Sequence, residues 1–563
     1  MADHKEISVD QKEGPNSQTA SFSHQASRVD NDNHDESLLD GAAKATVQEQ
    51  TMGLRKGLKM YPKAVGWSIV ISTAIVMEGF DKALIRSLFA NVAFREQFGH
   101  ERPNGTYDLA PSWQTALSIA SVVGEILGLM ANGILAERYG YRKTIILSLI
   151  LTIAFIFITF FAKNVSQLLA GQILMGLPWG VFQTITVTYA SEVCPVVLRA
   201  YLTTYINLCW VFGQFIAAGV LRAMTQRSDQ WSYRIPFALQ WMWPVPIMIG
   251  VFLAPESPWW LVRRGKRDMA RKALIRLASR NQVDFDPDAT IAMMEHTNAM
   301  EKALSEGTSY LDCFRGVNLR RTEIVCCTWM VQIFTGVALS GYSAYFYIQA
   351  GLAPQHAFTM TMVQYALGAV GTMCSWFLMA RFGRRQLYLW GIVALFTILL
   401  IVGIVSVSVP SSNSAVGWAI GSLLITWTAL YDLSVGPVCY ALVSELASTR
   451  LRAKSVVLAR CVYNMGYIVL GILTPRMLNP SAWGWGARSG FFWAGFAAIC
   501  FTWVFFRLPE PKGRTYGELD ILFERRISAR KFSSTVIDPI EDGKDILHDT
   551  KLPMEERVEK VSV

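Results

Sequence analysis

Two carboxylates, Glu78 and Asp81, lie in the middle of an apolar segment. Residues 64–77 carry no charge, and residues 83–92 are again apolar apart from Arg86. About 20 apolar residues are enough for a helix to cross a bilayer. A charged side chain at bilayer depth costs about 3 kcal/mol or more, so it usually faces a partner or a cavity. Three residues apart on a helix, the two acids share a face and predict a polar pathway with a proton site.

The composition indicates a polytopic membrane protein. Of 563 residues, 52% are hydrophobic and 17% are charged, whereas soluble proteins carry about 25% charged residues. The net charge of +9 does not predict a nucleic-acid partner, because the first fifty residues hold ten acids and four bases. The excess positive charge therefore belongs to the membrane body and its loops. The nine cysteines show no metal-ligand spacing, and we expect no metal and no cofactor.

Twelve apolar segments can be counted, six on each side of a long polar loop. They lie near residues 64–91, 112–136, 144–162, 167–190, 201–223, 237–254, 322–350, 357–380, 386–409, 415–443, 455–478 and 488–507. The predicted fold is all-α, with twelve transmembrane helices in two six-helix halves. The predicted regions are a disordered cytoplasmic tail (1–60), the first half (61–254), a cytoplasmic loop with short helices (255–321), the second half (322–507) and a cytoplasmic C-terminal tail (508–563).

The loop charges predict the orientation. The loops after segments 2, 8 and 10 carry clustered Arg and Lys, whereas the loops after segments 7 and 9 carry none. The positive-inside rule then places both termini and the central loop in the cytoplasm. The loop after segment 5 disagrees, because Arg222, Arg227 and Arg234 would lie outside. The sequon at Asn104 would lie outside and could be glycosylated.

A glycine flanked by clustered arginines occurs at matching points of the two halves, in residues 133–143 and 379–385. One interpretation is that these cations anchor the cytoplasmic face. The other is that they pair with acids after segments 4 and 10, and that these ion pairs close the cytoplasmic side and break when it opens. The candidate gating residues are Glu137, Arg138, Arg142, Glu192, Arg199, Arg381, Arg384, Glu445 and Arg450.

At these motifs the chain resembles the major facilitator superfamily and, within it, the sugar porter family. Residues 255–261, Pro-Glu-Ser-Pro-Trp-Trp-Leu, follow the first half and resemble one sugar porter signature. Residues 509–515, Pro-Glu-Pro-Lys-Gly-Arg-Thr, follow the second half and resemble another, with Pro511 in place of Thr. Residues 176–183, 186–195 and 202–214 are similar to the fungal maltose permeases, which are α-glucoside:proton symporters of the plasma membrane.

This resemblance implies roles for charged residues inside the membrane. Seven lie away from the ends of the apolar spans: Glu78, Asp81, Lys82, Arg86, Glu125, Asp432 and Arg460. The positions that match Glu78, Asp81, Glu125 and Arg460 are implicated in proton coupling in the maltose permeases. The alternative is a static ion-pair network, and Arg460 could instead reach the cytoplasmic face.

Three charges depart from the maltose permease pattern: Lys82, Arg86 and Asp432. Lys82 lies four residues after Glu78 and could neutralise it, which would leave Asp81 as the acid that titrates. Alternatively, the extra cations could bind an anionic group on the substrate.

Sugar recognition needs amide and hydroxyl groups together with aromatic surfaces. A buried amide must find partners, whereas a single Trp or Tyr more often packs in the core or at the membrane interface. The candidate substrate-binding residues are Gln183, Gln214, Gln332, Asn207, Trp179, Tyr342, Tyr345 and Asn464.

The sequence contains no Gly-x-x-x-x-Gly-Lys-Ser/Thr loop and no catalytic constellation, so neither an ATP-driven pump nor an enzyme is expected. Three functions stay open: proton-coupled import of a maltose-like α-glucoside, transport of another glycoside or metabolite, and a non-transporting sugar sensor. A sensor would carry a longer cytoplasmic tail than the 56 residues after segment 12. The expected partners are a sugar, a proton and the bilayer, with the protein acting as a monomer in the plasma membrane.

Overall fold

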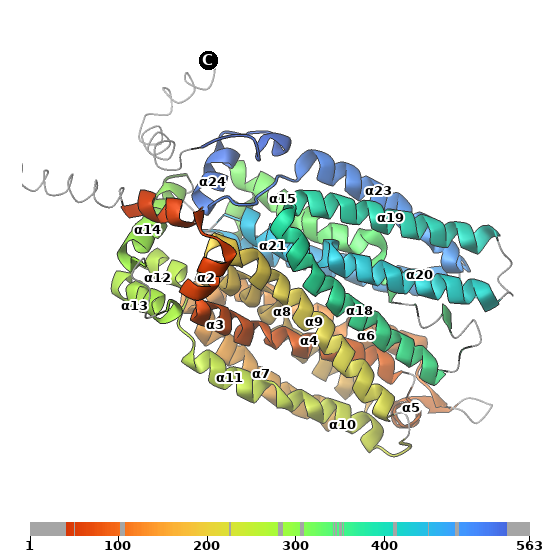
Figure 1. Cartoon of the computed structure of the whole chain (residues 1–563). Helices are drawn as coiled ribbons and strands as arrows, with labels where there is room; N and C mark the ends of the chain where they lie inside the picture. Colours follow the sequence, from red (N-terminus) through yellow and green to blue (C-terminus); the bar gives the residue numbers. More distant parts are fainter. Residues whose placement is uncertain are drawn as a thin grey trace, which may run out of the picture.

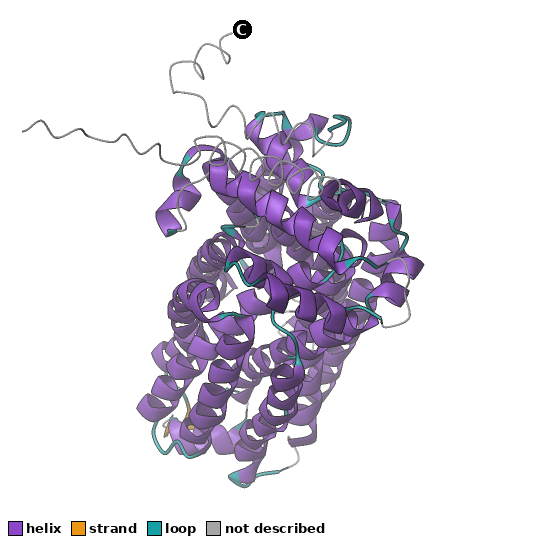
Figure 2. Cartoon of the chain, turned by 90° about the vertical axis from the view of Figure 1, so that its left-hand side faces the viewer, coloured by secondary structure: helices purple, strands orange, loops and turns teal. Residues whose placement is uncertain are grey.

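The computed structural model describes residues 41–537, apart from residues 50, 90, 102–106, 225–226, 280–284, 305–308, 342, 344–345, 348–351, 353, 409–413, 449 and 479–482. In these ranges the chain is a bundle of long helices with a group of short helices at one end (Figure 1 and Figure 2). The only sheet described is an antiparallel pair of short strands, β1 (His100–Glu101) and β2 (Tyr107–Asp108). The all-α fold predicted from the sequence is confirmed.

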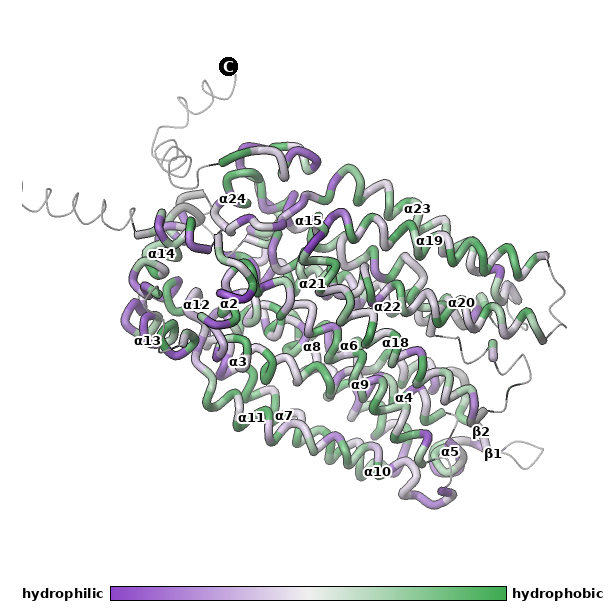
Figure 3. Tube along the Cα trace, viewed as in Figure 1, coloured by the Kyte–Doolittle hydropathy of each residue, from purple (hydrophilic) through white to green (hydrophobic). Residues whose placement is uncertain are grey.

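Eleven helices in the described ranges are long and apolar enough to cross a membrane. In the first half they are α6 (Pro111–Tyr139), α7 (Tyr141–Phe160), α8 (Val165–Val193), α9 (Val196–Met224) and the series α10 (Trp231–Leu239), η1 (Gln240–Met242) and α11 (Pro244–Leu253). In the second half they are α15 (Gly316–Gln332) with η3 (Ile333–Val337) and α16 (Ala338–Ser340), α18 (Pro354–Arg381), α19 (Arg384–Ser408), α20 (Ser414–Leu433) with α21 (Val435–Leu446), α22 (Arg452–Leu478), and η4 (Gly486–Arg488) with α23 (Ser489–Arg507). Figure 3 shows that hydrophobic residues predominate along these helices.

The first predicted segment, 64–91, forms two helices instead of one. α3 (Pro62–Ser72) and α4 (Ala74–Leu88) meet at Thr73. Their lengths of 11 and 15 residues are each below what a membrane span needs. Joined end to end they supply the twelfth span, and α4 carries the charges Glu78, Asp81, Lys82 and Arg86.

Two breaks in other spans lie beside buried acids. Gln240 begins the 3₁₀ turn between α10 and α11, and its side chain donates to Asp81. Ser434, with φ −131° and ψ −82°, separates α20 from α21 two residues after Asp432. Non-helical backbone at membrane depth is tolerated only where protein buries it or where it lines a cavity. Both breaks therefore belong to the interior of the bundle.

Glycines set the spacing of the helices that carry the charges. At Gly124, Gly128, Gly176 and Gly180, a Cβ would overlap backbone atoms across the contact between α6 and α8. Gly79 and Gly213 do the same between α4 and α9. Lipid supplies no hydrophobic drive for helix association, so small residues that permit close packing take its place. This packing brings Glu78, Glu125 and Gln183 from three helices to one point.

The short helices gather at one end of the bundle, which we call the cap end, while α5 (Val92–Phe98) and the two strands lie at the other end (Figure 1). The cap end carries α2 (Leu54–Met60), α12 (Pro258–Arg263), α13 (Arg267–Leu277), α14 (Pro287–Leu304), η2 (Tyr310–Phe314), α24 (Tyr516–Glu524) and η5 (Ala529–Lys531). Hydrophilic residues are concentrated there (Figure 3).

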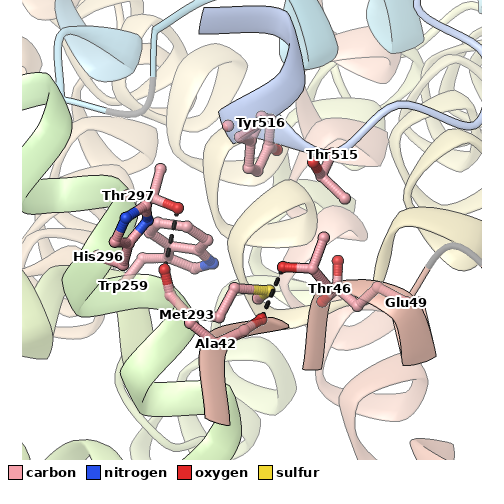
Figure 4. A pocket seen from close by; sticks show the side chains of 10 residues that line it. Ala42, Thr46, Glu49, Trp259, Met293, His296, Thr297, Thr515 and Tyr516 are labelled. Carbon is pink, nitrogen blue, oxygen red and sulfur yellow. Dashed lines mark hydrogen bonds between the residues drawn. The ribbon is translucent and has the colours of Figure 1, made fainter. Parts of the chain in front are cut away.

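The tail predicted to be disordered as far as residue 60 contains two helices in its described part. Residues 41–49 are helical, and Ala42 and Ala45 are buried against Ala292 and Met293 of α14. α2 follows, and its Met60 is fully buried. Figure 4 shows the pocket between this first helix, α14 and α24. Residues 41–49 and α2 therefore depart from the predicted disorder, because alanines give a weak hydrophobic signal and yet pack closely on another helix.

Candidate functional site

Two carboxylates and one ammonium group meet inside the first half. Lys82 Nζ lies 2.8 Å from Glu78 Oε1 and 3.0 Å from Glu125 Oε1. Both glutamates are fully buried. The pair between Glu78 and Lys82 is the one expected from their spacing along a helix, whereas Glu125 arrives from α6. Lys82 therefore neutralises two acids at once.

Amide side chains extend this cluster into the second half. Gln183 Nε2 donates to Glu78 at 2.6 Å and to Glu125 at 3.0 Å, and Gln183 Oε1 accepts from Arg460 Nε at 2.7 Å. Asn464 Nδ2 donates to Glu125 at 3.1 Å. Arg460 and Asn464 both belong to α22. These six residues (Glu78, Lys82, Glu125, Gln183, Arg460 and Asn464) form a polar cluster that we call the central network, and it joins the two halves.

The central network is electrically balanced, with two acids and two bases. Arg460 is 4% exposed, and its guanidinium lies 4.4 Å from the Trp329 ring centroid and 4.2 Å from that of Tyr463. It is therefore held inside the bundle, between aromatic faces, by contacts that suit a guanidinium. Removing one partner from such a network leaves a buried charge uncompensated, which costs about 3–5 kcal/mol. When the two halves separate, the hydrogen bonds from Arg460 to Gln183 and from Asn464 to Glu125 must break.

Asp81 lies outside the central network. Its Oδ1 accepts from Gln240 Nε2 at 2.8 Å, and the side chains of Gln172 and Trp179 also face it. The sequence predicted that Glu78 and Asp81 share one polar face of a helix. Instead, Asp81 turns toward α8 and η1 within the first half, without an ion pair in the described part of the chain.

A small cavity opens beside the central network. Its walls are formed by Lys82, Ile85, Arg86, Leu117, Ser118, Ser121, Val122, Gln172 and Tyr467. Arg86 donates to Tyr467 OH at 2.9 Å, so this cavity also lies between the halves. Gln172 connects it to Asp81. Two cations, one amide and three hydroxyl groups therefore supply its polar side chains.

The candidate substrate-binding residues are dispersed over several contacts. Gln332 donates to Gly436 O of α21 at 2.9 Å, and Asn207 donates to Asp432 and Thr372. Gln214 is buried on α9. Trp179 is fully buried in the core of the first half. Tyr342 and Tyr345, like the sequon at Asn104, lie outside the described residues.

Ion pairs join the halves at the cap end. Glu137, at the end of α6, pairs with Lys454, at the start of α22. Glu192, at the end of α8, lies 3.0 Å from Arg263 and 3.6 Å from Arg452. It also accepts hydrogen bonds from Tyr141 and Ser257. The cap end is therefore closed.

Tyr516 of α24 adds a stacked contact to this closure. The guanidinium of Arg199 lies 3.6 Å from its ring centroid and that of Arg452 lies 3.9 Å from it. Its hydroxyl donates to Ser191 O at 3.3 Å. Burial raises the pKa of Tyr516, against the lowering effect of the two arginines, so the phenol stays neutral. The C-terminal segment thereby holds one arginine from each half.

Among the other gating candidates, Arg142 and Arg384 contact residues of their own halves. Arg142 donates to Phe252 O, and Arg384 lies 3.5 Å from Glu445. Arg138 lies over the ring of its neighbour Tyr139, Arg381 is exposed and Arg450 is partly buried.

Several partners at the cap end were absent from the sequence prediction. In the sequence, Lys454 is one of the clustered cations after segment 10 that indicate only the orientation, and Arg263 and Tyr516 have no assigned role. Arg263 and Tyr516 each closely follow one of the two Pro-Glu motifs, and this position is the signal in the sequence that could have indicated their role. Glu323, at the start of the seventh segment, is likewise absent from the predicted sites, and it pairs with Arg507 of α23.

No group of three or more His, Cys, Asp or Glu residues that could hold a metal ion occurs among the described residues. Within those ranges, the side chains of the central network instead pair with one another. The two halves are joined there by hydrogen bonds, which can break and re-form.

Comparison with known proteins agrees with this geometry. The family profile described as "Sugar (and other) transporter" matches residues 67–523. The chain is 43% identical over 522 residues to a "General alpha-glucoside permease" of Saccharomyces cerevisiae, covering 92% of this chain and 84% of that protein. It is 41% identical over 530 residues to "Maltose permease MAL61" of Saccharomyces cerevisiae, covering 92% and 86%. The major facilitator proton:xylose symporter XylE bound to 6-bromo-6-deoxy-D-glucose superposes with a TM-score of 0.72 at 19% identity, covering 82% of this chain and 99% of XylE.

Proposed function

Because the chain belongs to the sugar (and other) transporter family, we propose that it imports a maltose-like α-glucoside by proton symport. The names of its relatives, an α-glucoside permease and a maltose permease, support the substrate class. Membership of a transporter family agrees with the expectation that the chain is not an enzyme. The observation that carries the proposal is the central network, in which buried carboxylates are tied to the second half by breakable hydrogen bonds.

Transport proceeds by alternating access between the two halves. We assign the cap end to the cytoplasm and the protein to the plasma membrane, so the closed cap end corresponds to a state that does not open inward. The sugar replaces the hydrogen bonds of Gln183 and Asn464, with Gln214, Gln332 and Asn207 as further amide partners. Trp179, Tyr342 and Tyr345 stay candidates for the apolar face of the sugar ring.

Protons enter through carboxylates that lose their partners as the halves move. Glu78 and Glu125 share Lys82, whereas Asp81 accepts a hydrogen bond from the amide of Gln240 and has no ion pair among the described residues. Asp81 is therefore the best carrier among the acids of the first half. Arg460 approaches or leaves the network as α22 moves and so favours or disfavours the ionised acids. The gate is the set of contacts around Glu137 and Glu192 at the cap end.

Uptake of labelled sugars in yeast cells that lack their own permeases tests the proposal. Maltose should accumulate against its gradient, and its addition to de-energised cells should make the medium more alkaline. Asp81→Asn should abolish both, while Asp229→Asn, a change at an exposed residue, should leave them intact. Absence of α-glucoside uptake, with the protein at the cell surface, would refute the substrate class.

A second candidate is a glycoside or metabolite with an anionic group. The observation that favours it is the cavity wall, where Lys82 and Arg86 lie side by side with Tyr467. A panel of maltose, trehalose, sucrose, cellobiose, glucose and a phosphorylated glucoside separates the two candidates. Stronger competition by the phosphorylated compound than by maltose would favour the second.

A further inference from the structure

A second buried acid, Asp432, lies at the contact between the halves and outside the central network. It is the last but one residue of α20 and is 5% exposed. Asn207 of α9 donates from Nδ2 to Asp432 Oδ1 at 3.0 Å and to Thr372 Oγ1 of α18 at 3.1 Å. One amide from the first half therefore connects to two helices of the second half, 165 and 225 residues further along the chain.

The surroundings of Asp432 are shaped for a carboxylate and nothing larger. α18 passes it at Gly368, where a Cβ would lie 2.5 Å from Asp432 Oδ2. On the other side is Gly436 of α21, where a Cβ would lie 3.3 Å from Oδ1. Two glycines thus leave room for both oxygens beside the helix break at Ser434.

No cation neutralises this acid in the described part of the chain. Glu78 and Glu125 share Lys82, whereas Asp432 forms no ion pair there. Tyr365 of α18 and Tyr431 of α20 are titratable groups that face it. The charged or titratable side chains that face those tyrosines are Arg86 of α4, Tyr388 of α19, Cys439 and Tyr440 of α21, and Tyr463 and Tyr467 of α22. A buried carboxylate in such surroundings is costly while it is ionised.

We propose that Asp432 is a second proton-binding site, in the half opposite to Asp81, and that its protonation loosens the contact between α9 and α20. Binding a proton converts the carboxylate to a neutral acid. The hydrogen bond from Asn207 then loses its charge-assisted character, and such bonds are about half as strong when neutral. The halves separate more easily at this contact when Asp432 is protonated. This inference rests on the proposed proton-coupled transport.

The proton-to-sugar ratio of the reconstituted full-length protein tests the inference. Maltose uptake and the accompanying proton uptake are measured in proteoliposomes for the wild type, Asp432→Asn and the control Asp229→Asn. Asp432→Asn should lower the ratio by about one proton per sugar, because one titrating group is gone. Maltose counterflow, which needs no net proton movement, should continue and shows that the variant is folded. Asp432→Ser should behave in the same way.

Infrared difference spectra of the purified protein, recorded between acidic and neutral pH, give a readout that does not need transport. The wild type should show the C=O band of a buried carboxylic acid that Asp432→Asn lacks. An unchanged ratio and an unchanged band in Asp432→Asn would overturn the inference. If the band depends on Asp432 but wild-type maltose uptake moves no protons, the proposed symport fails and the proton site stands.

Discussion

Glu256 and Glu510 make equivalent contacts in the two halves of the molecule. The carboxylate of Glu256 accepts the backbone N–H groups of the first two residues of α7, at 3.0 and 3.2 Å. The carboxylate of Glu510 accepts those of the first two residues of α19, both at 2.9 Å. The first N–H groups of a helix have no partner within it and attract negative charge. Each Pro-Glu motif therefore caps the helix that follows the glycine-arginine motif of its own half.

The glycines of the repeated motif are explained by the same contacts. A Cβ at Gly140 or at Gly383 would collide with the carboxylate of Glu256 or Glu510, respectively. Gly140 also has φ of 91°, a conformation that residues with a side chain rarely adopt. The duplication seen in the sequence thus corresponds to one capping arrangement used twice.

Replacing either of the capping glutamates, Glu256 or Glu510, should destabilise the protein. Glu256→Gln and Glu510→Gln keep the shape but lose the charge-assisted hydrogen bonds, which should cost about 1–3 kcal/mol each. Thermal unfolding in detergent measures this. Glu295→Gln, which breaks the partly exposed pair with Arg267, is the matched control and should cost less than about 1 kcal/mol. Equal effects of all three changes would contradict the capping role.

The cap at Glu256 also predicts a pH dependence. Burial raises the pKa of Glu256, although hydrogen bonds from the backbone of Ser257, Arg142 and Tyr141 oppose this shift. The folded state therefore holds the proton more tightly than the unfolded state. The linked stabilisation is complete below the unfolded pKa and is lost as pH rises through the folded pKa. The melting temperature of the wild type, relative to that of Glu256→Gln, should rise as the pH falls from neutral toward the ordinary pKa of a glutamate. A constant difference would contradict the shift.

Removal of the acid at the centre of the gate should open the cap end. Glu192→Gln leaves the fully buried Arg452 without its partner, which should cost the closed state about 3–5 kcal/mol. Native Cys194, buried between α8 and α9, should then react with a membrane-permeant maleimide more than about tenfold faster. Peptide mass spectrometry gives the rate at this cysteine alone, and Glu295→Gln serves again as the control. An unchanged rate would exclude Glu192 from the gate.

The stacking of Tyr516 between two arginines predicts a clear difference between two substitutions. Tyr516→Leu removes both cation–π contacts, each worth about 0.5–2 kcal/mol. Tyr516→Phe keeps the ring and loses only the hydrogen bond to Ser191. The Cys194 reaction should therefore accelerate in the leucine variant and stay near the wild-type rate in the phenylalanine variant. Similar rates in both variants would show that the hydroxyl group, and not the ring, holds the contact.

Lys82 should be coupled energetically to the acids that it neutralises. Lys82→Met leaves Glu78 and Glu125 facing each other and should lower stability by about 3–5 kcal/mol. Adding Glu125→Gln removes one uncompensated charge and should restore part of that loss. A double-mutant cycle on thermal unfolding measures the coupling energy. Additive effects of the two changes would mean that the contact between Lys82 and Glu125 contributes nothing.

Much of the fold follows from local patterns in the sequence. The length of each apolar segment determines a helix that can cross a bilayer, and the count of twelve survives because α3 and α4 join at Thr73. The pairing of Glu78 with Lys82 was also predictable, because residues four apart are neighbours on any helix. The motifs at the end of each half indicated the duplication, and the resemblance to sugar porters followed from them.

The tertiary structure alone decided which helix each polar face meets. Three residues of helix turn the chain to within about 60° of its starting direction, enough to aim Asp81 at Gln240 while Glu78 faces Lys82 and Gln183. Helical periodicity tells which residues share a face, but the partner of that face depends on how closely neighbouring helices pack. Here glycines on α4, α6, α8 and α9 set that packing. For the same reason the contact of Asp432 with Asn207, between distant parts of the chain, could not be predicted from the sequence.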